Sequence, residues 1–108
     1  DYTVNYATGR GMYVIADCKR NDIGSTASCY SKAYLGKTDI NGKKIKAFPA
    51  DMLTVNGYLG TDGIAPFVED CKKYDKGIFV LVKTSNPSSG ELQNLKLENG
   101  RCIYEQMG

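Results

Sequence analysis

The feature that most restricts the possible folds is a repeated unit made of a short apolar run, a polar loop and a segment with helical periodicity. The apolar runs predict strands at Met12–Asp17, Met52–Asn56 and Gly77–Val82. Strands that alternate with helices in this way pair in parallel through right-handed crossovers. The sequence therefore predicts an α/β fold of about three βα units, with the last strand covered on both faces because it is apolar throughout.

The segments between these strands predict helices and one small excursion. Helices are expected at Gly24–Leu35, at about Ile64–Tyr74 with Pro66 in its first turn, and near Glu91–Leu95. Asn41-Gly42 lies between alternating apolar and polar residues of the segment Lys37–Phe48, which predicts a two-stranded hairpin outside the core.

The two ends of the chain predict partial elements. Asp1–Ala7 resembles the last turns of a helix that Gly9 closes, and Arg101–Gly108 resembles the opening of another element. We therefore expect residues 1–108 to form a single unit that is the central segment of a longer domain.

Length and charge exclude several classes of protein. A chain of 108 residues is the size of one domain, and a hydrophobic content of 42% with 24% charged residues is typical of a globular protein. The net charge is +2 and the lysines form no large basic patch, so we expect no nucleic-acid partner. The apolar runs are too short to span a membrane, and no signal-peptide pattern opens the chain.

The absence of histidine excludes further chemistry. Without histidine the chain has no serine-histidine triad, no HExxH zinc site and no histidine general base. The four cysteines show no CxxC pair, so no zinc site is expected, and they are interpreted as reduced thiols of a cytoplasmic protein.

The polar loops follow the strands directly, as DCKRND, NGYLG and TSNP. In folds built from βα units, the chemistry lies at the carboxyl ends of the strands. We therefore expect these three loops to converge at one edge of the sheet. Periodicity alone does not decide between an open sheet and a closed barrel.

The stretch DCKRND crowds opposite charges together at the end of a strand. Because side chains alternate along a strand, Asp17 and Lys19 are expected on one side and Cys18 and Arg20 on the other. Cα atoms two residues apart are separated by about 6.6 Å, which lets a carboxylate and an ammonium meet at their tips. Neighbouring carboxylates, among them Asp22, favour the charged form of the lysine and hold its proton in one place.

A purely structural interpretation competes with this one. Asp22 is also a plausible cap for the following helix, and Asp17 with Lys19 a plausible solvated ion pair. The stretch from Thr84 to Pro87 is equally compatible with an ordinary turn. Spacing alone favours these simpler interpretations.

Three stretches together resemble one family. DCKRNDIGSTA, DMLTVNGYLGTD and GIFVLVKTSNPSSGELQ occur in this order over nearly the whole chain, and they resemble orotidine 5'-phosphate decarboxylase in the branch with DxKRxDIGxT and TSNP. The resemblance implies a homodimeric (β/α)8 TIM barrel, of which this chain would be the third to fifth βα units. It also implies conversion of orotidine monophosphate to uridine monophosphate in pyrimidine synthesis, without metal or organic cofactor.

The resemblance also implies roles for individual residues. Lys19 would donate a proton to C6 of the pyrimidine, and Asp17 would lie against the substrate carboxylate. Asp22 would reach the neighbouring subunit's site. The substrate-binding residues would be Ile23 and Thr26 across the subunit interface, and Thr84 and Ser85 at the pyrimidine edge.

Parts that the family needs are not found in this chain. A second lysine, a ribose-binding aspartate and the phosphate-binding residues have no counterpart in it, and Gly57 stands where proline is common. Three barrel strands would leave two open edges, so we expect a part of a longer enzyme that is inactive or nearly so alone. Two alternatives stay open: a relative that acts on sugar phosphates with Mg²⁺, and a noncatalytic assembly module.

Overall fold

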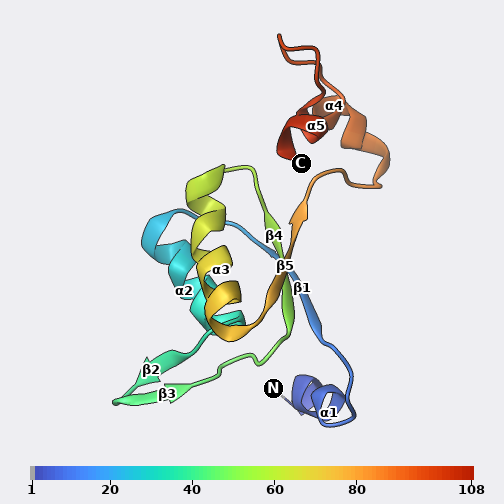
Figure 1. The fold of residues 1–108 in the computed structure, drawn as a ribbon. Helices are drawn as coiled ribbons and strands as arrows, with labels where there is room; N and C mark the ends of the chain where they lie inside the picture. The colour runs from blue at the N-terminus through green and yellow to red at the C-terminus, as the bar shows by residue number, and fades with distance from the viewer. Residues whose placement is uncertain (1) are drawn as a thin grey trace.

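Three parallel strands form the sheet at the centre of the molecule. The computed structural model describes residues 2–108, in which β1 (Ile15–Arg20), β4 (Met52–Asn56) and β5 (Gly77–Leu81) pair in the order β1-β4-β5. Figure 1 views this sheet nearly edge-on. Both pairings are parallel, so the carboxyl ends of all three strands lie at one edge, at the top of Figure 1. The predicted α/β fold with parallel strands is confirmed.

Strand β1 lies three residues further along the chain than predicted. It begins at Ile15, opposite Met52 of β4, whereas Met12 and Tyr13 are exposed before it. The prediction assigned only Asp17 of the charged stretch to the strand, but the strand continues to Arg20. Pairing with β4 sets the bounds of β1. Polar side chains can alternate along β1 because, in the described residues, one face of this strand packs against helices and the other is exposed.

Helices α2 (Gly24–Tyr34) and α3 (Thr61–Tyr74) lie side by side on one face of the sheet (Figure 1). Helix α2 has nearly the predicted bounds. Helix α3 begins three residues earlier than predicted, so Pro66 lies inside the helix and not in its first turn. The prediction for Pro66 was therefore wrong by one turn.

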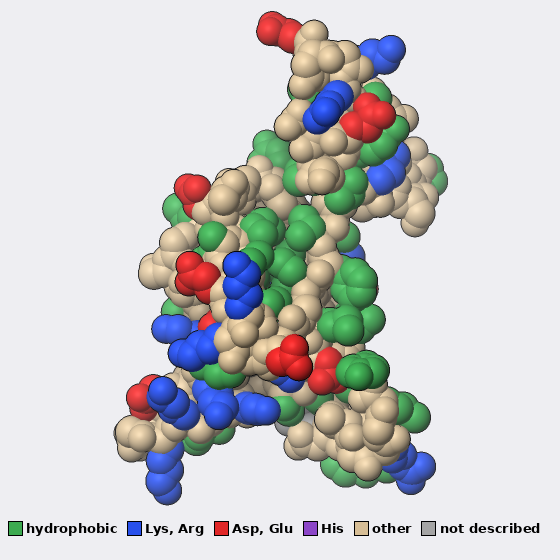
Figure 2. Space-filling model, viewed as in Figure 1, with side chains coloured by type: hydrophobic (Ala, Val, Ile, Leu, Met, Phe, Trp, Pro, Cys, Tyr) green, Lys and Arg blue, Asp and Glu red, His purple; other side chains and the backbone are tan. Residues whose placement is uncertain are grey.

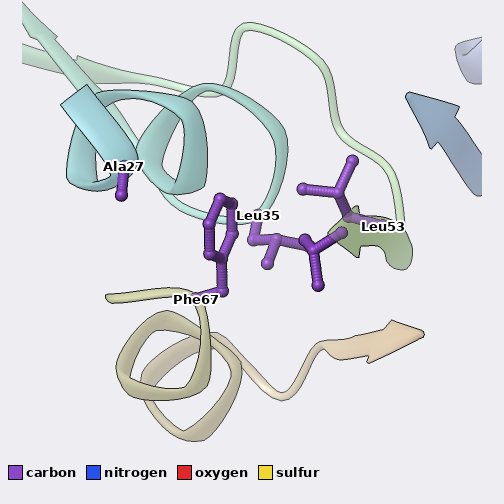
Figure 3. Packing of buried hydrophobic residues seen from close by; sticks show 5 residues of the cluster. Ala27, Leu35, Leu53 and Phe67 are labelled. Carbon is purple, nitrogen blue, oxygen red and sulfur yellow. The ribbon is translucent and has the colours of Figure 1, made fainter. Parts of the chain in front are cut away.

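The hydrophobic core lies between the sheet and these two helices. Leu53 and Val55 of β4 are fully buried, and Phe67 of α3 is buried against them (Figure 3). Ala27 and Leu35 complete this cluster from the side of α2. The alternation along β4 thus directs every second side chain into the core, as expected for a strand with helices on one face.

The opposite face of the sheet, here called the bare face, carries Ile15, Asp17, Lys19, Thr54 and Phe79. Ile15 is 49% exposed and Phe79 is 52% exposed, although both are large and apolar. Figure 2 shows hydrophobic side chains along the side of the sheet turned away from α2 and α3. The prediction that β5 is covered on both faces is therefore wrong for the residues that the structure describes.

Asp51 holds the amino edge of the sheet. Its carboxylate accepts a hydrogen bond from the backbone N–H of Val14 at 2.8 Å, and lies 3.8 Å from Nζ of Lys76. Its backbone carbonyl accepts the N–H of Gly77 at 3.1 Å. One residue before β4 therefore joins the starts of all three strands.

The predicted hairpin is confirmed. Strands β2 (Thr38–Ile40) and β3 (Lys43–Ile45) pair antiparallel outside the main sheet. Asn41 and Gly42 between them have φ values of 51° and 77°. Positive φ at both central residues is the signature of a tight hairpin turn, for which Asn-Gly is the preferred pair.

The elements at the two ends also agree with the sequence. Helix α1 (Tyr2–Thr8) precedes Gly9, and Asp1 lies outside the described residues. Beyond β5 a small lobe contains η1 (Pro87–Ser89), α4 (Gly90–Gln93) and α5 (Ile103–Met107) (Figure 1). Helix α4 is shorter than predicted and begins one residue earlier. None of the helices within residues 2–108 combines the length and the apolar character needed to cross a membrane.

Candidate active site

Asp17 and Lys19 form an ion pair near the carboxyl end of β1. Nζ of Lys19 donates a hydrogen bond to Oδ1 of Asp17 at 2.6 Å. The side chain of Lys19 is 51% exposed, and that of Asp17 is 64% exposed. The prediction that they share one side of the strand is confirmed, and the bare face is that side.

The backbone at Lys19 departs from a regular strand. Lys19 has a φ of 50°, and the pairing with β4 shifts between Ala16, opposite Leu53, and Arg20, opposite Val55. Residues 17–19 therefore form a β-bulge, a feature that re-aims side chains and is common beside active sites. A non-glycine residue in this conformation costs about 1–3 kcal/mol, so surrounding contacts must hold it.

Thr54, on the neighbouring strand, supplies those contacts. Its Oγ1 accepts a hydrogen bond from the backbone N–H of Lys19 at 3.0 Å and donates one to Oδ1 of Asp17 at 2.8 Å. The sequence interpretation did not select Thr54. The available signal was a polar residue in the middle of an apolar strand, at a position that alternates with the buried Leu53 and Val55.

The ion pair sets the protonation of the carboxylate. The hydrogen bond from Lys19 lowers the pKa of Asp17 below its ordinary value of 3.8, and the hydrogen bond from Thr54 lowers it further. Both donors favour the charged form of the carboxyl group. Asp17 is therefore an anion at neutral pH.

Cys18 and Arg20 point to the other side of β1, as predicted. Cys18 packs against the hydrophobic core, and the guanidinium of Arg20 lies over the rings of Tyr30 and Tyr34 of α2, 5.4 Å and 5.9 Å from their centroids. The four cysteines are free, in agreement with the predicted reduced thiols. Within residues 2–108, no three His, Cys, Asp or Glu side chains gather where a metal ion would be held.

Asp22, Ile23 and Thr26 follow β1, in the loop before α2 and in the first turn of that helix. Asp22 accepts a hydrogen bond from the N–H of Ile23 at 2.8 Å, and no side chain caps α2. The alternative of Asp22 as a helix cap is therefore not observed. Ile23 is 60% exposed and Thr26 is exposed in the first turn of α2. In the described part of this chain, none of the three forms a hydrogen bond or an ion pair with Lys19.

Thr84 and Ser85 follow β5 at the same edge of the sheet as the end of β1. Gln93 of α4 clamps Thr84, since its Oε1 accepts the N–H of Thr84 at 2.9 Å and its Nε2 donates to Oγ1 of Thr84 at 2.7 Å. Oγ1 of Thr84 in turn donates to Asn86 at 2.7 Å. Ser85 is exposed. The expected placement of the strand ends at one edge is confirmed, but neither residue forms a hydrogen bond with Lys19 in residues 2–108.

Gly57 leaves space for the C-terminal lobe. A Cβ atom at this position would lie 2.8 Å from Sδ of Met107 and 3.0 Å from Cγ1 of Val80. The side chains of Met107 and Val80 thus pack closely against Gly57, and a larger residue here would require the flexible end of Met107 to shift.

Comparison with known proteins supports a common origin with one family. Residues 2–106 match the family model described as Orotidine 5'-phosphate decarboxylase / HUMPS family. The orotidine 5'-phosphate decarboxylase of Caldicellulosiruptor saccharolyticus is 57% identical over 100 residues, which cover 93% of this chain and 32% of that protein. The one of Rhodopirellula baltica is 48% identical over 104 residues, with coverages of 96% and 33%.

A solved structure agrees with these sequence matches. The crystal structure of a protein from Streptomyces avermitilis, assigned as an orotidine 5'-phosphate decarboxylase, matches with a TM-score of 0.83 at 40% identity. The match covers 98% of this chain and 35% of that chain. The chain thus spans about a third of the length of its relatives and has the fold of the corresponding part of a TIM barrel. It belongs to the orotidine 5'-phosphate decarboxylase / HUMPS family.

Proposed function

We propose that this chain supplies the decarboxylation centre of an orotidine 5'-phosphate decarboxylase, which converts orotidine monophosphate to uridine monophosphate and carbon dioxide in the cytoplasm. The observation that carries the proposal is the ion pair between Lys19 and Asp17, 2.6 Å apart near the carboxyl end of β1. The remaining strands, with the phosphate-binding residues, would come from the other two-thirds of the barrel. Alone, the 108 residues would be inactive or nearly so.

In this reaction Lys19 both stabilises charge and donates the proton. Loss of carbon dioxide leaves an electron pair on C6 of the pyrimidine, and a positioned ammonium lowers the energy of that carbanion as it forms. At a separation of about 4 Å the attraction is about 1 kcal/mol in water and about 4 kcal/mol at an effective dielectric constant of 20. The larger value corresponds to about three decades in rate. Lys19 then protonates C6.

Asp17 has two roles in the proposal. It holds the ammonium of Lys19 in place, and it lies against the carboxylate of the substrate. The repulsion between the two anions ends when carbon dioxide leaves, which favours the reaction. Ground-state effects of this kind are contested, so we assign most of the rate enhancement to Lys19.

Thr84 and Ser85 would meet the pyrimidine edge, with different tasks. The hydroxyl proton of Thr84 is already donated to Asn86, and Gln93 occupies a lone pair of the same oxygen. The hydroxyl of Ser85 forms no hydrogen bond within residues 2–108. Ser85 is therefore the better partner for the base, and Thr84 holds the loop in place beside it.

Asp22, Ile23 and Thr26 would act across the interface of a homodimer. Two observations support this assignment: none of the three forms a hydrogen bond with Lys19 of the same chain within residues 2–108, and Ile23 is exposed. Asp22 would approach the lysine and ribose of the neighbouring site, with Thr26 near the ribose. Mixing an inactive Lys19→Ala enzyme with an inactive Asp22→Ala enzyme would then restore activity, because mixed dimers contain one intact site. No recovery after subunit exchange would contradict a shared site.

The alternative function is that of a relative that acts on sugar phosphates. The DIGST and TSNP stretches, and the names of the relatives with 57% and 48% identity, favour the decarboxylase. A sugar-phosphate enzyme of the alternative kind would use Mg²⁺ to stabilise an enediolate. Decarboxylation of orotidine monophosphate that is insensitive to EDTA would separate the two functions.

The proposal is tested by grafting the 100 residues that align with the decarboxylase of Caldicellulosiruptor saccharolyticus into that protein, in place of its aligned segment. We call this protein the graft. The graft should release carbon dioxide from carboxyl-labelled orotidine monophosphate and complement a pyrimidine auxotroph, whereas the 108-residue chain alone should do neither. A folded graft that binds but does not decarboxylate the substrate would refute the proposal.

A further inference from the structure

The hydroxyl of Thr54 makes two hydrogen bonds to the ion pair of Lys19 and Asp17, which an apolar strand residue could not make. It accepts the backbone N–H of Lys19 at 3.0 Å and donates to Oδ1 of Asp17 at 2.8 Å. We propose that Thr54 is a positioning residue, whose hydroxyl holds the β-bulge at Lys19 and the carboxylate of Asp17 in the geometry needed for proton transfer. The proposed effect on catalysis rests on the decarboxylase function proposed above.

The backbone explains why a hydroxyl is needed at this position. Ala16 lies opposite Leu53 and Arg20 opposite Val55, so one residue of β4, Thr54, faces residues 17–19 of β1. The regular ladder therefore has no carbonyl for the N–H of Lys19, and Oγ1 of Thr54 takes its place. This bond supports a backbone conformation, with φ at 50°, that lysine otherwise avoids.

The same hydroxyl orients the carboxylate. A threonine hydroxyl has one proton to donate and lone pairs to accept with. Here the proton goes to Asp17 and a lone pair receives the N–H of Lys19, while the carbonyl of Ala16, at 3.5 Å, is a poorer acceptor. Oδ1 of Asp17 therefore receives hydrogen bonds from Thr54 and from Nζ of Lys19, which fixes the ammonium relative to the strand.

A simpler interpretation is that Thr54 is present only because β-branched residues suit strands. Valine has the same shape without the hydroxyl, and serine keeps the hydroxyl without the methyl group. Thr54→Val and Thr54→Ser in the graft therefore separate shape from hydrogen bonding. Thr38→Val, which removes a hydroxyl from β2 in the hairpin, is the matched control because Thr38 contacts neither Asp17 nor Lys19 by a hydrogen bond.

We expect Thr54→Val to lower kcat of the graft by about tenfold or more with little change in KM, since one charge-assisted hydrogen bond and one backbone bond are lost. Thr54→Ser should keep kcat within about threefold, and Thr38→Val should leave it unchanged. The acidic limb of the pH profile should move to higher pH in Thr54→Val, because Asp17 loses a donor that favours its ionised form. A purely structural role would not move this limb.

A second measurement does not depend on activity. Hydrogen exchange of the Lys19 amide in the 108-residue chain should be at least about tenfold faster in Thr54→Val than in the wild type, and close to wild type in Thr54→Ser. A folded graft that binds the substrate without decarboxylating it would refute the proposed function, and amide exchange would still decide whether Thr54 positions Lys19. The inference would be overturned if Thr54→Val left the exchange rate of the Lys19 amide unchanged. It would also be overturned if Thr54→Val left kcat of an active graft unchanged.

Discussion

On strand β4, neighbouring side chains face different surroundings. Leu53 and Val55 are fully buried under the two helices, whereas Thr54, between them, lies on the bare face with Asp17 and Lys19. The covered face is apolar and closely packed, and the bare face carries charges, a bulge and a positive φ. The difference fits the proposed function, in which one face of the sheet supplies stability and the other would supply the chemistry.

The largest effect on stability should come from the covered face. Phe67→Ala removes a fully buried ring from the core, and should lower the free energy of unfolding by about 3–5 kcal/mol. Phe79→Ala, on the bare face, is the matched control and should cost less, because Phe79 is already half exposed. Urea unfolding of both variants of the 108-residue chain measures the difference, and equal losses would break the distinction between the two faces.

A smaller loss is expected at the amino edge of the sheet. Asp51→Ala leaves the N–H of Val14 without its acceptor and Lys76 without its anion, at a partly buried position. The expected loss is about 1–3 kcal/mol. Asp39→Ala, in the exposed hairpin, should change stability little. An Asp51→Ala chain as stable as the Asp39→Ala chain would show that this edge does not hold the strands together.

The smallest effect concerns the titration of Asp17. Because Lys19 and Thr54 lower its pKa, Lys19→Met should raise the midpoint of the Asp17 carboxyl toward 3.8. The folded-state pKa is depressed, so the contribution of this group to stability is present above about pH 4 and is lost as the pH falls through the folded-state pKa. Carbon-detected NMR of Asp17 measures the shift. A lower midpoint in Lys19→Met would have the wrong sign for an ion pair.

Local sequence signals predicted much of the fold. The Asn41-Gly42 pair predicted the hairpin turn, and the apolar runs predicted β4 and β5. The alternation of side chains along a strand predicted that Asp17 and Lys19 lie on the same side. These features depend on residues close together in the chain, for which propensity and periodicity are informative.

Features that depend on distant residues were not predicted. The contact of Thr54 with Lys19 joins residues 35 apart, and the bulge is visible only through the register of β1 against β4. For the same reason, the sequence placed β1 three residues too early. The clamp of Gln93 on Thr84 was not predicted, because periodicity within Glu91–Leu95 does not determine how this helix lies against the loop after β5.

The most direct test of the account is the rate of carbon dioxide release by Lys19→Ala in the graft, compared with Lys37→Ala at an exposed loop position. We expect Lys19→Ala to lower kcat by about three decades or more, with an unfolding midpoint close to that of the parent graft, and Lys37→Ala to leave both unchanged. A Lys19→Ala graft that stays folded and decarboxylates at the parental rate would contradict the assignment of chemistry to the bare face.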